Sequence, residues 1–306
     1  MSKLVLSTMY AQQQRFEDGG AFARYAAKSG YDAIEVSHST DEQKLRQIVR
    51  SRALPVTSVH QPAPRKRHTD GRWNGRVNLA SPDPEERAAA VAHAKESLSW
   101  AASLGASRLV VHLGQVTEVA EQFSEERELR RLFDSGRREE EQLLELHKQA
   151  LNRRQVACEP YLDAARASLL ELVAAASPSG IVIGLENRYH FHEIPLPGEY
   201  EFLLDGLDVG EAGYWHDTGH AEVLHRLGFV DRSAWLSALS SRCVGAHLHD
   251  VLGIGDHRAP GDGDVEWGYI VAGVKHLDSF TLEINQHQSD ERVRGSIDFL
   301  KEIGLG

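Results

Sequence analysis

Short apolar runs rich in β-branched residues alternate along the chain with longer segments whose apolar residues recur at helical spacing. The runs predict strands over residues 4–9, 33–37, 56–60, 108–112, 181–186, 214–217, 244–249 and 280–283. The segments with helical spacing predict helices over residues 21–29, 41–53, 84–104 and 291–303. Strands separated by helices indicate parallel βαβ units. Eight such units predict an α/β fold, the (β/α)8 TIM barrel.

One segment is too long for a simple barrel connection. Residues 116–177 follow the fourth predicted strand and mix charges of both signs with leucines at helical spacing. This pattern predicts two helices inserted after strand four, with an apolar stripe that packs on the barrel. A homodimer contact and a lid are the alternative roles. Because no linker rich in Pro, Gly and Ser interrupts the strand rhythm, we expect residues 1–306 to form one domain.

Composition narrows the class of protein. The chain has 306 residues, 41% of them hydrophobic, which is enough for the core of one large domain. No apolar stretch approaches the roughly 20 residues of a membrane helix, and the first residues lack a signal-peptide cleavage pattern, so a cytoplasmic protein without a membrane partner is expected. Cys158 and Cys243 lack the spacing of a disulfide framework or a thiolate zinc site. The formal net charge of −11 argues against a nucleic-acid partner, because such binding depends on phosphate neutralisation.

Four of the predicted strands end in residues that bind metals. Glu186, Asp217, His247 and Glu283 lie at or near the carboxyl ends of the last four predicted strands, separated by 31, 30 and 36 residues. In a barrel these ends meet at the mouth, where such folds place their active sites. Carboxylate and imidazole ligands without thiolate suit Mn²⁺ or Zn²⁺, with Mg²⁺ and Co²⁺ as alternatives. The pattern therefore predicts one catalytic divalent-metal site.

Further candidate ligands for metal or substrate fall on the same face of the predicted barrel, enough for two or three metals. They are His60, His112, His220 and His257. Strand alternation adds His249, which shares the inward side with His247, whereas His216 is predicted to face away from Asp217. His249 can either orient a carboxylate or contact substrate.

Basic and aromatic residues near the mouth indicate an anionic ligand. The loop over residues 61–78 contains Trp73 among five basic residues, and a solvated loop is the alternative. The basic residues are Arg65, Lys66, Arg67, Arg72 and Arg76. Trp73 can cap a sugar face or pin its own loop. Arg188, two residues after Glu186, can neutralise a substrate phosphate or carboxylate, or form an ordinary ion pair.

Seven short motifs reinforce this interpretation. They are VHQP (59–62), VHLG (111–114), LEN (185–187), HDTGH (216–220), HLHD (247–250), PGDGD (260–264) and LEI (282–284). Together they resemble the xylose-isomerase-like TIM-barrel superfamily over nearly the whole chain. That superfamily contains sugar and sugar-phosphate isomerases and epimerases, and also abasic-site nucleases of the endonuclease IV type. Asp-Thr-Gly-His and Gly-Asp-Gly-Asp are the more specific motifs.

The resemblance implies a metal-dependent sugar or sugar-phosphate isomerase or epimerase. Glu186, Asp217, His247 and Glu283 would hold the metal, and the two glutamates would exchange a proton with carbon through a metal-stabilised enediolate. It also implies that Glu35, which matches an acid often found on strand two, lies near the mouth, where it can orient a neighbour.

The endonuclease pattern implies the alternative, a zinc-dependent phosphodiesterase acting on abasic DNA or another phosphoester. That pattern adds His60, His112, His220 and His257 as ligands of a zinc cluster. The chain departs from it at one position, because the aspartate expected two residues before His257 is Gly255, with Asp256 displaced by one. The acidic net charge and the few basic residues outside 65–76 also favour the isomerase.

Overall fold

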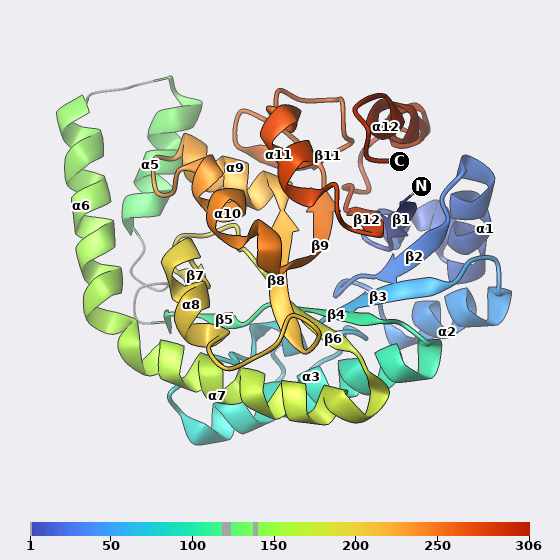
Figure 1. Cartoon of the computed structure of the whole chain (residues 1–306), viewed down its shortest axis with the longest axis horizontal. Coiled ribbons are helices and arrows are strands. Elements are labelled where there is room, and N and C mark those ends of the chain that lie inside the picture. The colour runs from blue at the N-terminus through green and yellow to red at the C-terminus, as the bar shows by residue number, and fades with distance from the viewer. Residues whose placement is uncertain (1, 118–123, 137–139) are drawn as a thin grey trace.

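The computed structural model describes residues 2–117, 124–136 and 140–306. Within these residues, parallel strands close into a barrel in the order β1-β12-β9-β8-β6-β4-β3-β2 (Figure 1). The barrel strands are β1 (Lys3–Ser7), β2 (Ala33–Val36), β3 (Val56–His60), β4 (Arg108–Val111), β6 (Val182–Glu186), β8 (Ala212–Asp217), β9 (Cys243–Leu248) and β12 (Ser279–Leu282). Each coincides with one of the predicted apolar runs, so the predicted α/β barrel is confirmed.

Helices surround this barrel, and polar caps mark where many of them begin. Six helices start after an Asp or Ser whose side chain accepts a hydrogen bond from an amide of the first turn. The helices are α1 (Gly19–Ser29), α2 (Glu42–Ser51), α3 (Pro84–Leu104), α5 (Ser124–Asp134), α6 (Glu140–Ala157), α7 (Glu159–Ala176), α8 (Tyr200–Leu203), α9 (Thr218–Arg226), α10 (Arg232–Leu239), α11 (Trp267–Val274) and α12 (Asp290–Glu302). No helix among the described residues is both long and apolar enough to cross a membrane.

Two short strand pairs lie in loops outside the barrel. Strand β5 (Gly114–Gln115) pairs with β7 (Glu193–Ile194), and β10 (Asp250–Leu252) pairs with β11 (Gly255–Arg258), both antiparallel. Both pairs therefore hold segments that follow barrel strands bearing the predicted ligands.

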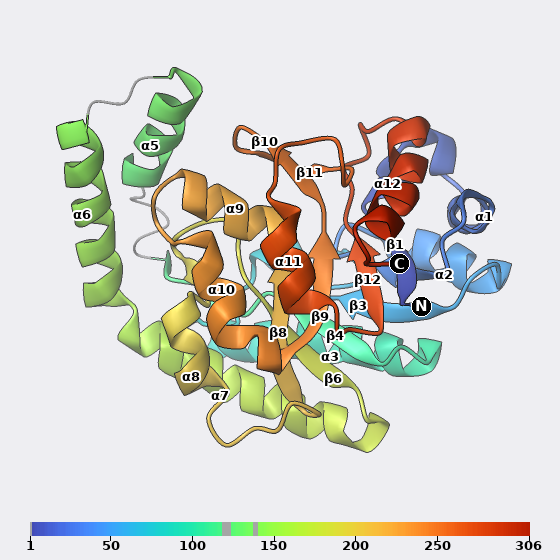
Figure 2. The same ribbon diagram turned by 45° about the horizontal axis from the view of Figure 1, so that its top comes forward.

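The predicted insertion contains an extra helix pair and one barrel helix. Helices α5 and α6 extend beside the barrel, as both views show (Figures 1 and 2). Helix α7 instead packs on α3 and β6, as the barrel's own helix does between β4 and β6. The two inserted helices expected from the sequence thus correspond to α5 and α6. Residues 118–123 and 137–139 of this segment lie outside the described part of the chain.

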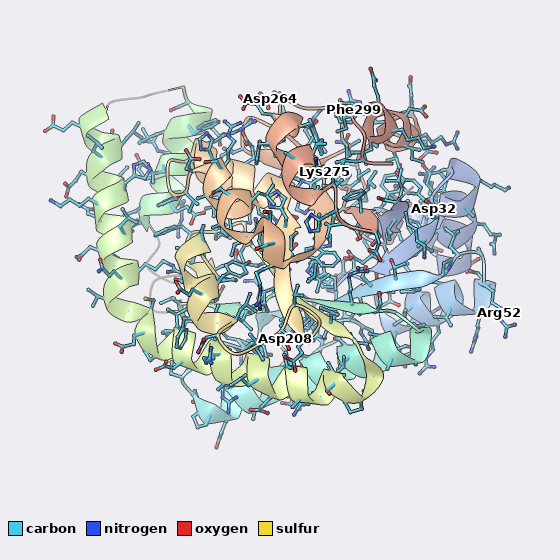
Figure 3. All side chains as sticks on the ribbon, in the orientation of Figure 1. Asp32, Arg52, Asp208, Asp264, Lys275 and Phe299 are labelled. Atoms are coloured by element: carbon cyan, nitrogen blue, oxygen red, sulfur yellow. The ribbon has the colours of Figure 1, made fainter. Side chains whose placement is uncertain are left out.

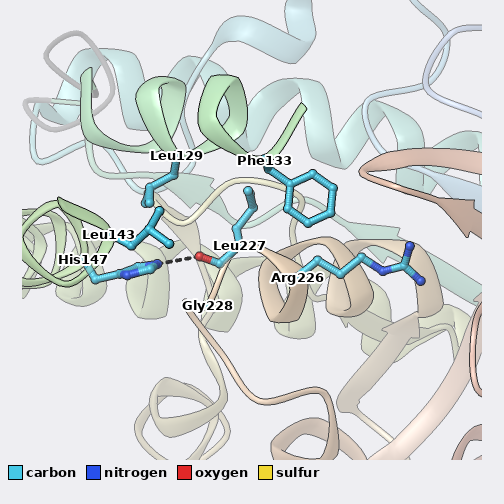
Figure 4. Close-up of a pocket in the computed structure, with 7 residues that line it drawn as sticks. All are labelled: Leu129, Phe133, Leu143, His147, Arg226, Leu227 and Gly228. Atoms are coloured by element: carbon cyan, nitrogen blue, oxygen red, sulfur yellow. Dashed lines mark hydrogen bonds between the residues drawn. The ribbon is translucent and has the colours of Figure 1, made fainter. Parts of the chain in front are cut away.

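A hollow of about 190 Å³ lies between this helix pair and α9 (Figure 4). Its lining is mostly apolar, and His147 Nε2 lies 2.5 Å from the carbonyl oxygen of Leu227, which joins α6 to the end of α9. The lining residues are Leu129, Phe133, Leu143, His147, Arg226, Leu227 and Gly228. The hollow therefore lies between the α5–α6 pair and the end of α9, and none of the predicted ligands lines it.

A large aromatic side chain packs inside the barrel. Trp215 points inward from β8 and packs with Val110 and Val244. A Cβ atom at Gly184 would lie 2.7 Å from the Trp215 ring, and one at Gly245 would overlap that ring, so both neighbouring strands need glycine here. The ring centroid of Trp215 lies 5.2 Å from that of His247. Side chains fill the space between strands and helices, while Arg52 lies at the outer surface (Figure 3).

Candidate metal centre

The predicted quartet converges at the mouth of the barrel. Glu186, Asp217 and His247 are fully buried and Glu283 is 1% exposed. One ligand atom from each residue lies within 4.8 Å of those of the other three. The Nδ1 atom of His247 lies 2.6 Å from Glu186 Oε1, 3.1 Å from Glu283 Oε2 and 3.7 Å from Asp217 Oδ2. The structure therefore brings all four side chains around one point.

The strand register explains this convergence. Asp217 at the end of β8 pairs in register with His247 on β9. Asn187, the residue after β6, holds the neighbouring strand end: its Oδ1 accepts from the Asp217 amide at 2.7 Å and its Nδ2 donates to the Asp217 carbonyl at 2.9 Å. The hydroxyl of Tyr214 also donates to Asn187 Oδ1 at 3.0 Å. Asn187, for which the sequence predicts no role, therefore fixes two ligand-bearing strands relative to each other.

Glu35 lies against the imidazole of the quartet. The Nε2 atom of His247 lies 2.9 Å from Glu35 Oε1, and Ser58 Oγ donates to Glu35 Oε2 at 2.7 Å, with both carboxylate contacts buried. A carboxylate that accepts the Nε2 proton of His247 directs Nδ1 at the quartet, where it can bind a cation once it has lost its own proton. The predicted orienting role of Glu35 thus has a geometric basis.

Charge within the quartet favours a bound cation. Burial raises the pKa of the Glu186 carboxyl, but the imidazoles of His60 and His247 lower it more, so this pKa lies well below its usual value. Burial likewise raises the pKa of the Glu283 carboxyl. The imidazole of His247 lowers it more, so this pKa is also well below its usual value. Burial lowers the pKa of His247, but Glu283, Glu35 and Glu186 raise it well above 6.5. Without a cation, protonated imidazole balances the buried carboxylates.

Buried atoms without partners support the same conclusion. Among the described residues, Glu283 Oε1 and His60 Nδ1 are buried without a hydrogen-bond partner and lie 3.5 Å from each other. Buried polar atoms are normally satisfied, so orphaned carboxylate and imidazole atoms beside a ligand set indicate a missing partner. The donor set of three carboxylates and one imidazole fits a divalent cation of the kind predicted.

A cluster of three histidines adjoins the quartet on the β2–β4 side. His60 Nε2 lies 2.5 Å from His112 Nε2, and His112 Nε2 lies 2.7 Å from Glu186 Oε2. His38 completes a group whose ligand atoms lie within 4.8 Å of one another. His38 is not among the predicted ligands, although it follows β2 much as His60 ends β3 and His112 follows β4.

A second cluster adjoins Asp217 on the opposite side. The ligand atoms of Asp217, His220, His249 and His257 lie within 4.8 Å of one another. His249 Nε2 lies 2.9 Å from Asp217 Oδ1, and the His249 ring stacks on that of His257 with centroids 4.3 Å apart. A Cβ atom at Gly219 would overlap the His249 ring, which explains the glycine of the HDTGH motif.

Asp256, the aspartate displaced by one position from the endonuclease pattern, lies beside this cluster. Asp256 Oδ1 lies 3.1 Å from His257 Nδ1, and Asp256 Oδ2 lies 3.9 Å from His220 Nε2. His257 has a left-handed backbone with φ of 54°, which is uncommon for a residue other than glycine. Asp256 therefore lies beside two histidines of the cluster but outside the group of ligand atoms that lie within 4.8 Å of one another.

Gly-Asp-Gly-Asp, the other of the two more specific motifs, forms a loop around Asp250. The carboxylate of Asp250 accepts hydrogen bonds from the amides of Gly261 at 3.0 Å and Val265 at 3.1 Å. A Cβ atom at Gly263 would overlap this carboxylate, so the PGDGD segment must be glycine-rich to wrap around Asp250. Asp250 therefore positions the hairpin that presents His257.

Three other predicted residues have different surroundings. Arg188 Nη1 lies 2.7 Å from Glu186 Oε2 and Nη2 lies 3.0 Å from Glu193 Oε1, so Arg188 joins the quartet through Glu186. Trp73 instead lies beneath two arginines of its own loop, which agrees with the alternative that it pins this loop. His216 Nδ1 lies 2.6 Å from the Tyr214 hydroxyl on the outward side of β8, as strand alternation predicts.

Comparisons with known proteins agree with this fold. A sequence model described as xylose isomerase-like TIM barrel matches residues 23–303. Comparison with curated proteins finds no match for the chain. A solved D-tagatose 3-epimerase-like protein is 19% identical, with a TM-score of 0.68 over 98% of this chain and 96% of that one. A D-psicose 3-epimerase from Clostridium cellulolyticum H10 is 16% identical, with a TM-score of 0.67 over 99% of each chain. A 3-keto-D-glucoside 4-epimerase from E. coli is 14% identical, with a TM-score of 0.65 over 99% of this chain and 100% of that one. At these identities the solved structures establish a common fold.

Proposed function

The chain belongs to the xylose isomerase-like TIM barrel family, and on that premise we propose that it is a metal-dependent sugar or sugar-phosphate isomerase or epimerase. The observation that best supports this reaction is the pair of buried glutamates, Glu186 and Glu283, which approach one imidazole nitrogen at 2.6 and 3.1 Å. Several solved structures with this fold are sugar epimerases by name, which agrees with the choice.

Glu186, Asp217, His247 and Glu283 would hold the cation. When bound, a divalent cation supplies a Lewis acid that stabilises negative charge developing on a substrate oxygen. An ionised glutamate at the site can act as general base and remove a proton from a carbon beside a carbonyl, leaving an enediolate. The other glutamate returns a proton, to the opposite face in an epimerase or to the neighbouring carbon in an isomerase. Substrate stereochemistry decides which glutamate acts first.

The pKa values of both glutamates lie well below the usual value in the metal-free protein, so the one that donates must first receive a proton from a neighbour. His257 Nε2 lies 3.8 Å from Glu283 Oε2, so this imidazole is placed to resupply a proton to Glu283. Glu186 also has imidazole neighbours, with His60 Nε2 at 3.4 Å and His112 Nε2 at 2.7 Å, and Arg188 at 2.7 Å favours its ionised form. Each glutamate therefore has an imidazole with which it can exchange a proton, so these contacts do not decide which of the two acts first.

A zinc-dependent phosphodiesterase is the second candidate, and a specific observation favours it. Histidine clusters adjoin the quartet on both sides, and Asp256 lies beside His220 and His257. Several bound zinc ions would supply hydroxide near neutral pH and stabilise a leaving oxygen. Against nucleic acid as its substrate stands the net charge of −11.

Carbon–hydrogen exchange tests the first proposal. Metal-loaded protein is incubated in D2O with a panel of ketoses, ketose phosphates and keto sugar acids, and deuterium beside the carbonyl is measured by NMR. Glu186→Gln and Glu283→Gln should each reduce exchange about 10²- to 10⁴-fold, the usual contribution of general acid–base catalysis. Glu201→Gln, an exposed glutamate on α8, is the control and should exchange as the wild type does.

Elemental analysis and thermal melting of the same variants separate lost chemistry from lost metal or fold. Retained exchange in both glutamine variants would refute the acid–base roles. Hydrolysis of a phosphodiester by a protein that exchanges no carbon-bound hydrogen would support the second candidate instead.

A further inference from the structure

A small polar hollow opens beside the quartet, with a volume of about 90 Å³. This exceeds the roughly 30 Å³ that a water molecule takes up in the liquid. His112 lines the hollow and lies 2.7 Å from Glu186 Oε2, so the hollow leads directly to one of the two glutamates. Its charged walls are Arg76, Arg188 and Glu193.

The walls of this hollow are held rigidly. Asn78 donates to the carbonyl of Gln115 at 2.8 Å and accepts from the Gln115 amide at 3.1 Å. Gln115 in turn pairs in register with Glu193 across the β5–β7 ladder. The turn that presents Arg76 is fixed by the buried Asn74, whose Nδ2 donates to the Pro64 carbonyl at 3.0 Å. The hollow is therefore a preformed feature of the mouth.

Four of the five basic side chains in the loop over residues 61–78 are bound within the protein. Two of them pair with carboxylates, and two lie over an indole ring. The partners are Glu96 for Lys66, Asp70 and Glu86 for Arg72, and the ring of Trp73 for Arg65 and Arg67 at 3.9 and 3.7 Å.

Arg76 differs from these four. Its side chain is exposed and lines the hollow, and among the described residues its guanidinium has no carboxylate or aromatic partner. Arg188 is paired, but its bonds to Glu186 and Glu193 use three of its five N–H groups. One N–H on each terminal nitrogen of Arg188 is thus left for a ligand among the described contacts.

We propose that this hollow receives an anionic group, phosphate or carboxylate, at the end of the sugar remote from the reacting carbon. The inference rests on the proposed function and narrows it to sugar phosphates and sugar acids over neutral sugars. Two guanidinium groups and one carboxylate give the charged walls a formal charge of +1 in a chain of net charge −11. The planar fork of N–H donors on arginine matches the oxygens of phosphate and carboxylate. A neutral sugar would leave the Arg76 guanidinium without a partner.

Anion binding tests this inference without depending on turnover. Inorganic phosphate and glycolate are titrated into the metal-loaded protein by calorimetry. Arg76→Gln should weaken binding of at least one of the two about tenfold to a hundredfold, as expected for lost hydrogen bonds to a charged group. Arg50→Gln, which removes an exposed charge from α2, is the matched control and should bind as the wild type does. Binding unchanged in Arg76→Gln, or binding of neither anion by the wild type, would overturn the inference.

Kinetics then identify which anion the substrate bears. In the deuterium exchange assay, Arg76→Gln should raise KM about tenfold or more for a ketose phosphate or a keto sugar acid, with kcat within a few-fold and with KM for a neutral ketose unchanged. An equal rise in KM for neutral and charged sugars would overturn the inference. If no sugar exchanges with any variant, the proposed function fails, while the calorimetric result still decides whether Arg76 binds an anion.

Discussion

Replacing Glu35 by alanine tests how the candidate metal centre is held. The substitution removes the acceptor 2.9 Å from His247 Nε2 and the acceptor 2.7 Å from Ser58 Oγ, both in a buried setting. Loss of a carboxylate that orients a metal-binding histidine typically weakens metal binding 10- to 100-fold, or about 1.4–2.7 kcal/mol. We expect Glu35→Ala to weaken Mn²⁺ or Zn²⁺ binding by this amount.

The free energy of unfolding of the metal-free protein should change less in Glu35→Ala than the free energy of metal binding does. Two buried polar groups without partners cost about 1–3 kcal/mol each. The substitution also removes one of four carboxylates gathered around His247, which relieves repulsion among Glu35, Glu186, Asp217 and Glu283. These effects oppose each other, so we expect the free energy of unfolding of the metal-free protein to decrease by an amount near the lower end of that range.

Chelator competition for metal affinity and urea denaturation of the metal-free protein measure the two effects separately. Glu35→Gln keeps an oxygen that accepts from His247 Nε2, so its metal affinity should fall less than that of Glu35→Ala. Ser58→Ala removes only the other contact of Glu35 and is the control, with metal affinity expected within about threefold of wild type. If Glu35→Ala binds metal as tightly as the wild type, this carboxylate does not orient His247 and the reasoning is refuted.

Three further predictions concern pH, the barrel interior and the inserted helices. Burial lowers the pKa of His60, but Glu186 and Glu283 raise it to about 9 in the metal-free protein. A cation held by the quartet would repel this protonated imidazole, whose Nε2 lies 3.4 Å from Glu186 Oε2, so metal affinity should rise between pH 6 and 9 with proton release in calorimetry. A pH-independent affinity would contradict this. Because this pKa is raised on folding, its stabilising contribution is complete below about 6.5 and should be lost as the pH rises through about 9, seen as a fall in the free energy of unfolding of the metal-free protein. Gly245→Ala should lower the free energy of unfolding by about 1–3 kcal/mol because the added Cβ would overlap Trp215. Gly295→Ala in α12, which has open space around it, is the control and should not. Equal melting temperatures for the two variants would contradict the packing argument. Glu126 on α5 is buried and accepts from the amide of Phe191, so Glu126→Ala should raise amide hydrogen exchange throughout α5, and unchanged protection would show that this contact does not hold the helix.

The sequence predicts the features that depend on strand periodicity. Apolar runs locate the barrel strands, and residues at their carboxyl ends must meet at the mouth, which is why the quartet converges. Alternation also separates His249, which faces Asp217, from His216, which faces outward. These conclusions need only local spacing and the closure of the barrel.

Features that depend on distant partners could not be predicted. Asp256 reaches His220 only because the hairpin backbone turns through a left-handed residue, which spacing does not reveal. Nothing local distinguishes Arg76 from the other basic residues of its loop, because their partners lie on other elements or are decided by side-chain packing. Asn187 acts through backbone contacts of a neighbouring strand and carries no ligand signal of its own.

Trp215 also has a consequence for how a hydrogen isotope on the substrate would exchange with solvent during the reaction. The ring of Trp215 lies 5.2 Å from that of His247 and packs with Val110 and Val244, so we expect bulk water to reach the glutamates from the mouth. A sugar seated there would shield the abstracted proton from solvent, so the first glutamate can return it to the same carbon and regenerate the substrate before it exchanges with water. The fraction of tritium retained in recovered substrate would then report how long the occupied mouth stays sealed relative to the lifetime of the enediolate.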